Sequence, residues 1–244
     1  MAGPLVALLL VAADPATPTL RWYGQSMVQL TTAGGKRVVF DPHAIPEFGP
    51  PRVDADIVLL SHRHSDHTQM SAIIEPKAAR VFHGLKEAAG GRPPDWAKVD
   101  EKVGGIRVRS VPLFHDAEAG MVRGKNSAWV VEADGLTVCH LGDLGHDLTP
   151  AQAAAVGPVD VLLVPVGGIY TVNGEQARRV VAQVKPRRLV VPMHYGVPGV
   201  YDELLTADEF LDGLPRVKRQ ASNAVPIPAE VPAGGFEVVV PGWK

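Results

Sequence analysis

The segment that most constrains this chain is Ser61–His67, whose sequence SHRHSDH holds three of the nine histidines and one aspartate. It directly follows the apolar run Ile57–Leu60, which predicts a buried strand. Imidazoles two residues apart on an extended chain point to the same side, so His62 and His64 can converge on one ion. The end of this strand is therefore the first candidate metal site.

The second half of the segment predicts a neighbouring site. Asp66 and His67 come where the chain turns toward a helix expected over Thr68–Ile74, so they can face a second ion nearby. If this segment were an exposed polar turn without a metal, crowding imidazole and carboxylate groups there would bring no packing advantage. It would also cost repulsion between like groups. Two adjacent metal sites explain the segment better than chance does.

Three later strands also end on residues that bind metals. Predicted apolar strands run into His115, Asp143 and His194. An isolated histidine after a strand is more often structural than a ligand, but three such endings together with the first segment reverse that expectation. The candidate metal ligands are therefore His62, His64, Asp66, His67, His115, Asp143 and His194.

The composition limits what kind of protein can carry such a site. The 24 Lys and Arg against 26 Asp and Glu give a formal net charge of −2, and no run of Lys or Arg exceeds two. We therefore expect a small-molecule substrate and no nucleic-acid partner, while the oligomeric state stays open. The single cysteine, Cys139, excludes an intramolecular disulfide and a cysteine-rich zinc module, so imidazole and carboxylate must hold the metal.

The order of predicted elements favours two β-sheets with outer helices. Strands come early as a meander and later alternate with helices. The expected strands are 20–23, 27–31, 37–40, 57–60, 107–114, 128–132, 136–141, 161–166 and 188–191, with a hairpin turn at Asp134–Gly135. Capping signals predict helices over 150–156 and 174–184, and a capping box at Thr206–Glu209 predicts a short helix to about Leu211.

The N-terminus carries a nine-residue apolar run, Leu5–Ala13, which is too short to span a bilayer. It ends in small residues that a signal peptidase can cleave, although no Lys or Arg precedes it. We expect residues 1–18 to be a signal peptide and lead-in, with an ordinary N-terminal core segment as the alternative, and residues 19–244 to be one metallo-hydrolase domain. The protein would be periplasmic or secreted in the first case and cytoplasmic in the second. No other stretch is apolar enough to cross a membrane.

The ligand pattern resembles that of the metallo-β-lactamase fold superfamily over roughly residues 20–212. The motif HxHxDH is present at residues 62–67, and the later His, Asp, His series at residues 115, 143 and 194. Within the superfamily the chain looks most like the lactonase-like group that includes the L-ascorbate-6-phosphate lactonases. The stretches that carry this likeness are 40–42, 123–126, 141–146, 165–171 and 192–196. The resemblance implies an α/β (α+β) fold, a four-layer αββα sandwich of two mixed β-sheets flanked by helices.

The resemblance also implies how the ligands divide. His62, His64 and His115 would hold a first ion, Asp66, His67 and His194 a second, and Asp143 would bridge both. Such a ligand set suits two divalent ions about 3.5–4 Å apart with a shared hydroxide as the nucleophile. Without a thiolate, Zn²⁺ fits best, and Mn²⁺ and Fe are also chemically acceptable.

Two residues depart from that pattern. Many relatives have a histidine where this chain has Gln25, and many have Asp-Pro-Trp or similar where it has His43 after Asp41 and Pro42. Because these positions border the pocket, they weaken any carry-over of substrate but not of metal binding. Asp41 can hydrogen-bond a ligand imidazole and orient it, or it can be a simple strand-end turn residue.

Several other residues have open roles. His146 is a candidate proton donor to the leaving group and, with Asp66, completes the predicted catalytic set. The turn Arg123–Asn126 can bind an anionic group, or it can be a hairpin loop in which Asn126 bonds the backbone. Tyr170–Thr171 can line the pocket. His140 is expected in the core or at the surface, and Cys139 as a small buried hydrophobic residue. Asp116 can steer substrate or order a loop, and His83 is expected to be structural.

These observations predict a metal-dependent hydrolase of a small molecule, acting on an ester or lactone ahead of a phosphoester. A nuclease or phosphodiesterase of the same fold is the first alternative. Only 51 residues separate Asp143 from His194, which leaves no room for the inserted domain of processing nucleases, and the chain lacks a basic stripe. A non-catalytic metal-binding protein, or a redox di-iron domain, is the second alternative.

Overall fold

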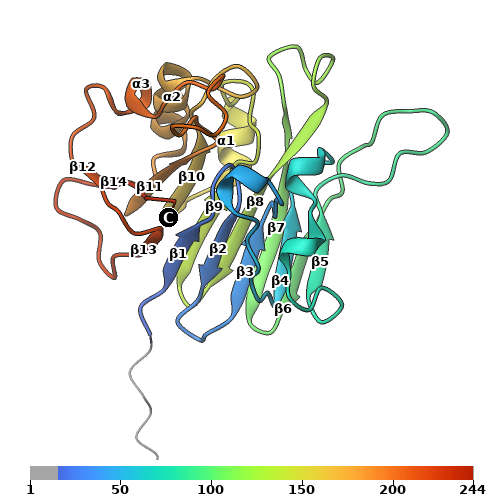
Figure 1. The fold of residues 1–244 in the computed structure, drawn as a ribbon, viewed down its shortest axis with the longest axis horizontal. Helices are drawn as coiled ribbons and strands as arrows, with labels where there is room; N and C mark the ends of the chain where they lie inside the picture. The colour runs from blue at the N-terminus through green and yellow to red at the C-terminus, as the bar shows by residue number, and fades with distance from the viewer. Residues whose placement is uncertain (1–15, 244) are drawn as a thin grey trace, which may run out of the picture.

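The computed structural model describes residues 16–243, which form two β-sheets packed face to face with three α-helices beside one of them (Figure 1). The first sheet has the order β13-β1-β2-β3-β4-β5 and the second β12-β14-β11-β10-β9-β8-β7-β6. The first contains β1 (Thr19–Trp22), β2 (Val28–Thr31), β3 (Arg37–Phe40), β4 (Ile57–Leu60), β5 (Arg80–His83) and β13 (Ala224–Pro226). The second contains β6 (Asp100–Val103), β7 (Ile106–Phe114), β8 (Lys125–Ala133), β9 (Leu136–His140), β10 (Val161–Pro165), β11 (Leu189–Met193), β12 (Val217–Arg219) and β14 (Glu237–Val240).

Both sheets are mixed. In each, an antiparallel meander continues into parallel strands: β1 to β3 lead into β4 and β5, and β6 to β9 lead into β10 and β11. Every residue of β10 and β11 is buried, as their unbroken apolar sequence predicts for strands covered on both faces. The predicted sandwich of two mixed sheets is confirmed, and its parallel strands end at common edges.

The helices gather on the second sheet, where α1 (Pro150–Val156), α2 (Gly174–Val184) and α3 (Asp208–Leu211) lie together (Figure 1). Thr149 and Asn173 form the capping boxes expected of α1 and α2. The capping box predicted at Thr206 is wrong. The Glu209 carboxylate accepts instead from the backbone N–H of Gly174 at the start of α2, and the N-cap of α3 is Ala207 without a side-chain bond.

The outer face of the first sheet is covered by loops and short 3₁₀ turns, and the α-helix predicted over Thr68–Ile74 is wrong. Only Met70–Ala72 forms a 3₁₀ turn there. Two backbone N–H groups of this segment bond the preceding loop: Gln69 donates to the carbonyl of Pro42, and Ile74 donates to that of Val53. These hydrogen bonds to the loop compete with the backbone hydrogen bonds within the segment that an α-helix needs.

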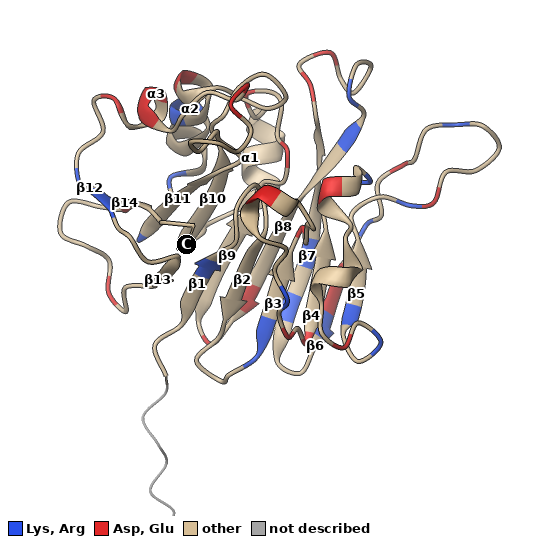
Figure 2. Ribbon diagram, in the orientation of Figure 1, with Lys and Arg blue, Asp and Glu red and all other residues tan. Residues whose placement is uncertain are grey.

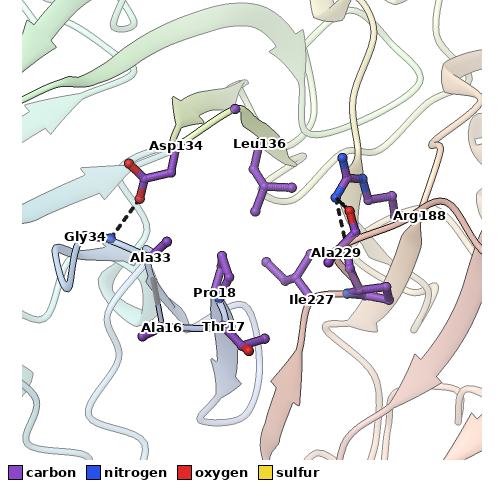
Figure 3. A pocket seen from close by; sticks show the side chains of 12 residues that line it. Ala16, Thr17, Pro18, Ala33, Gly34, Asp134, Leu136, Arg188, Ile227 and Ala229 are labelled. Atoms are coloured by element: carbon purple, nitrogen blue, oxygen red, sulfur yellow. Dashed lines mark hydrogen bonds between the residues drawn. The ribbon is translucent and has the colours of Figure 1, made fainter. Parts of the chain in front are cut away.

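The two sheets are also joined at the end opposite the strand ends that carry the candidate ligands. Asp134 and Gly135 form the predicted two-residue hairpin turn, both at positive φ as a type I′ turn requires. The Asp134 carboxylate accepts a hydrogen bond of 2.9 Å from the backbone N–H of Gly34 in the first sheet (Figure 3). A hollow of about 600 Å³ lies beside this contact. Its charged groups, Asp134 and Arg188, both already bond backbone groups.

The predicted signal peptide, Leu5–Ala13, lies outside the described residues. Within residues 16–243, none of the helices combines the length and the apolar character that crossing a bilayer requires.

We expect the core of the second sheet to dominate stability. Leu163→Ala, in fully buried β10, should lower the free energy of unfolding by about 2–5 kcal/mol because it removes apolar contacts and leaves a cavity. Leu205→Ala is the matched control at a side chain that is 43% exposed, and it should cost about 0.5 kcal/mol or less. Urea unfolding of both variants measures the difference, and equal losses would contradict this description of the core.

Candidate metal centre

The candidate ligands meet where strands of both sheets end. His62 follows β4 of the first sheet, while His115 follows β7 and His194 follows β11 of the second. Asp143 lies three residues beyond β9, which runs parallel to β10 and β11. Because these strands present their carboxyl ends at one edge, residues from position 62 to position 194 come together there.

Six of the seven candidate ligands form two adjoining groups. The ligand atoms of His62, His64 and His115 lie within 4.8 Å of one another, and so do those of His67, Asp143 and His194. The seventh, Asp66, lies at the side of the second group, with its Oδ2 3.6 Å from Nε2 of His67. A third group, Asp41, His62 and His67, overlaps the other two, so the side chains form one continuous cluster.

One carboxylate oxygen lies between the two groups. Asp143 Oδ2 is 3.1 Å from Nε2 of both His67 and His194, 3.3 Å from Nε2 of His115 and 3.9 Å from Nε2 of His62. This single oxygen therefore contacts imidazoles of both groups.

Two of the four rings facing Asp143, those of His62 and His67, are oriented by a second carboxylate, Asp41. Its Oδ2 lies 3.1 Å from Nδ1 of His67 and accepts a 2.6 Å hydrogen bond from the Ser61 hydroxyl. The Ser61 oxygen lies 2.8 Å from Nδ1 of His62. Protons on these Nδ1 atoms leave both Nε2 lone pairs directed into the centre, which is the arrangement by which proteins prepare histidines for metals. Sequence reasoning anticipated Asp41 but missed Ser61, which directly precedes His62.

Two of the donor atoms lie at a distance that allows either a hydrogen bond between the rings or a shared metal ion. Nε2 of His62 and Nδ1 of His64 are 3.1 Å apart, so two ring nitrogens face each other at close range. A tetrahedral ion with bonds of about 2.0–2.1 Å to nitrogen holds its ligand atoms roughly 3.3 Å apart. The spacing of this pair therefore suits a bound cation of zinc's size.

The electrostatics keep Asp143 ionised and act in opposite directions on the pKa values of the imidazoles around it. Burial lowers the pKa of His64, and it lowers that of His62 well below its usual range. Burial alone would raise the pKa of Asp143, but the imidazoles of His194 and His67 outweigh it and hold that pKa well below its usual range. Burial opposes the protonation of His67, yet the carboxylates of Asp143 and Asp41 raise its pKa well above the ordinary value. Asp143 therefore stays ionised as a carboxylate ligand must.

Close backbone approach fixes Asp143. At Gly142, whose φ is +55°, a Cβ atom would lie 2.3 Å from Oδ1 of Asn126, so a side chain has no space there. Asn126 donates to the carbonyl of Leu141 and accepts from the N–H of Asp143. The Ser26 hydroxyl donates to Asp143 Oδ1 at 3.1 Å, which leaves Oδ2 to face the rings.

Comparison with known proteins agrees with this geometry. A family profile described as the β-lactamase superfamily domain matches residues 19–194. The chain belongs to the metallo-β-lactamase superfamily. It is 33% identical to a UPF0173 metal-dependent hydrolase of Methanoregula boonei over 184 residues, which cover 72% of this chain and 81% of the relative.

Other relatives give the same result. A UPF0173 metal-dependent hydrolase of Thermococcus onnurineus is 27% identical over 191 residues, covering 72% of this chain and 84% of the relative. A solved structure from Thermotoga maritima, named as a candidate Zn-dependent hydrolase of the metallo-β-lactamase superfamily, is 33% identical with a TM-score of 0.69. The match covers 92% of this chain and 98% of that one. The chain therefore stands among the metal-dependent hydrolases of this superfamily.

Gln25, where many superfamily members have a histidine, is part of the second group. Its Nε2 donates to Asp66 Oδ2 at 2.9 Å and lies 3.0 Å from Nε2 of His67. Its Oε1 accepts from the N–H of Ser26, which fixes the orientation of the amide. The Gln25 carbonyl also accepts from the N–H of His194. The amide therefore steadies Asp66, although it also offers a proton to the His67 nitrogen that faces the centre.

The remaining histidines bond the backbone. His146, the candidate proton donor, lies with Nε2 accepting from the N–H of Phe114 and Nδ1 2.7 Å from the carbonyl of Asp147. Neither ring nitrogen is free among the described contacts, so we do not carry its catalytic role further. His140 is buried, as expected, with Nε2 2.9 Å from the Ser26 carbonyl. Burial lowers the pKa of His43 to about 4.

The structure also shows where the other residues without an assigned function lie. Cys139 is buried and its thiol pKa is raised to about 12 by that burial, so it is a core side chain. His83 is exposed at the end of β5. The Asp116 carboxylate accepts from four backbone N–H groups and thereby orders the loop after His115. The four donors are Glu118, Gly120, Val122 and Arg123.

We expect Asp41 to control metal affinity without touching the metal. Asp41→Asn should weaken zinc binding by about 10–100-fold, because it removes the charge that orients His67 and, through Ser61, His62. Competition against a chelator of known zinc affinity measures this. Ser61→Ala is the matched control: it interrupts only the connection to His62 and should have a smaller effect. Unchanged affinity in Asp41→Asn would refute the orienting role.

Proposed function

We propose that the protein hydrolyses an ester or lactone of a small molecule with the help of two divalent ions. The observation that carries this proposal is the position of Asp143 Oδ2 between two groups of imidazole nitrogens. Ions held there would polarise the attacked carbonyl or phosphoryl group and lower the pKa of the water that attacks it.

The proposed division of ligands follows the geometry. His62, His64 and His115 would hold the first ion, and His67 and His194, with Asp66 beside them, would hold the second. Asp143 would serve both, supplying one negative charge to two cations. Asp66 is 34% exposed at its side chain and stays held by Gln25, so it can face both the second ion and the solvent.

The donor chemistry favours zinc among the candidate metals. Imidazole nitrogen and carboxylate oxygen both suit Zn²⁺, and no thiolate is available because Cys139 is buried and protonated. Mn²⁺ and Fe remain chemically acceptable on the same donors. The relative from Thermotoga maritima is named for zinc, which supports the same choice.

A nuclease is the less favoured activity. Figure 2 shows basic and acidic residues interspersed along the strands and loops, whereas a duplex or single strand needs a continuous basic surface. Between Asp143 and His194 the described chain is occupied by α1, β10, α2 and β11. A phosphodiester remains the second candidate substrate class because two-metal centres also stabilise phosphoryl transfer.

The metal content is the first test. We expect protein purified without chelator to retain close to two equivalents of a transition metal, chiefly zinc, measured by plasma mass spectrometry. Dialysis against a strong chelator should abolish hydrolysis, and zinc should restore it. His64→Ala should lose part of the metal because it removes one ligand of the first group. Less than about half an equivalent in the wild-type protein would refute a two-metal hydrolase.

The substrate class needs a separate screen. Metal-loaded protein should be offered lactones, aryl esters, thioesters and phosphodiesters, with His64→Ala as the control for metal-independent hydrolysis. We expect lactone or ester turnover to fall at least about 100-fold in His64→Ala, since the loss of positioned electrostatic stabilisation has that magnitude. Turnover confined to phosphodiesters would favour the second candidate.

A further inference from the structure

A hollow of about 420 Å³ opens beside the first group of candidate ligands. It is lined by His62, Arg63, His64, Leu85, Pro93, Pro94, Ala119, Gly120, Arg123, Gly124 and Lys125. Three of these side chains are cationic and none is a carboxylate. Two of the three cations, Arg63 and Lys125, form ion pairs with carboxylates outside the lining, which leaves Arg123 without one within residues 16–243.

Arg123 is the one of the three cations that forms no ion pair in the described part of the chain. Its backbone N–H donates to the Asp116 carboxylate, which also orders the rest of the loop. Its guanidinium donates to the carbonyl of Ile169 at 3.0 Å and lies 5.2 Å from the centre of the Tyr170 ring. No carboxylate pairs with this guanidinium among the described residues. A stacked guanidinium whose remaining N–H donors have no anionic partner is prepared to bind an oxyanion.

Lys125 adds a second positive charge to the lining of the hollow. Its ammonium lies 4.3 Å from the centre of the Trp96 ring and 2.8 Å from Asp95. The Asp95 side chain is 61% exposed, so this ion pair stabilises little and can yield to a ligand. Arg63 is less available, because its donors already bond Leu85, Lys86 and Glu87.

The rest of the lining is apolar and small. Leu85 and the pair Pro93 and Pro94 come from the loop after β5, while Ala119 and Gly120 come from the loop that Asp116 orders. Such a surface accepts a short carbon skeleton, and the volume lies at the lower end of the range for small-molecule sites. The lining of the hollow therefore combines apolar side chains with cationic ones.

We propose that this hollow binds the acidic group, a carboxylate or a phosphate, of the substrate whose ester or lactone bond is broken at the adjacent centre. Arg123 makes the principal contact and Lys125 assists. The inference rests on the proposed function, and it narrows the substrate class to small anionic esters and lactones.

The first test measures binding without turnover. Succinate and glycerol 3-phosphate are titrated into metal-loaded protein by calorimetry, and the tighter of the two identifies the preferred acid. Arg123→Gln should weaken that binding by at least about 10-fold, because it removes a charge-assisted donor pair. Arg123→Lys should restore part of it. Arg52→Gln, at an exposed arginine outside the hollow, should leave the affinity unchanged.

The second test compares two aryl esters that differ by one carboxylate: 4-nitrophenyl acetate and mono-4-nitrophenyl succinate. We expect kcat/KM to favour the anionic ester, and Arg123→Gln to reduce that preference. Lys125→Met, which leaves the Asp116 loop intact, should reduce it by a smaller factor. Tm and metal content are measured in parallel to identify a variant that loses activity because it unfolds. If Arg123→Gln unfolds, the comparison of Arg123→Lys and Lys125→Met with the wild-type protein decides the result.

The outcomes separate the two proposals. Equal affinity of wild-type protein and Arg123→Gln for both anions would overturn the anion site. Ester hydrolysis without preference for the anionic ester would overturn it as well while sustaining the proposed function. Weakened binding in Arg123→Gln without hydrolysis of any ester would sustain the anion site and reject ester hydrolysis.

Discussion

The rest of the structure depends on one buried carboxylate, Asp143, which faces four imidazole nitrogens with a single oxygen. A buried charge of this kind is costly unless it is compensated, and here the surrounding rings compensate it. The surroundings are built to keep it in place: the absence of a side chain at Gly142, the amide of Asn126 and the hydroxyl of Ser26 each restrict its position. A metal ion on either side of the carboxylate would add to the compensation of its negative charge that the rings provide.

The centre also explains why two sheets are needed. Asp41, at the end of β3 in the first sheet, orients His62 and His67, whereas the second sheet supplies Asp143, His115 and His194. Neither sheet can assemble two groups of ligands alone. Their packing thus determines the distances in the centre, and core substitutions that shift one sheet against the other will alter metal affinity as well as stability.

The convergence of His62, His115, Asp143 and His194 could be predicted from the sequence because all four follow apolar strands, and parallel strands end at one edge. Ser26 could not be predicted, since its contact with Asp143 joins residues 117 positions apart and a serine carries no periodic signal. The edge strand β6 was missed because its sequence, DEKV, is charged and exposed, unlike a core strand. The helix expected over Thr68–Ile74 failed because bonds to a neighbouring loop outweighed local propensity.

The central claim is that Asp143 lies between two metal ions. X-ray anomalous scattering from a crystal of the zinc-loaded protein, recorded on both sides of the zinc absorption edge, tests it most directly. The account predicts two anomalous peaks roughly 3.5–4 Å apart, one beside His62, His64 and His115 and the other beside His67 and His194, with the Asp143 carboxylate between them. A single peak, or two peaks that Asp143 does not contact, would contradict it.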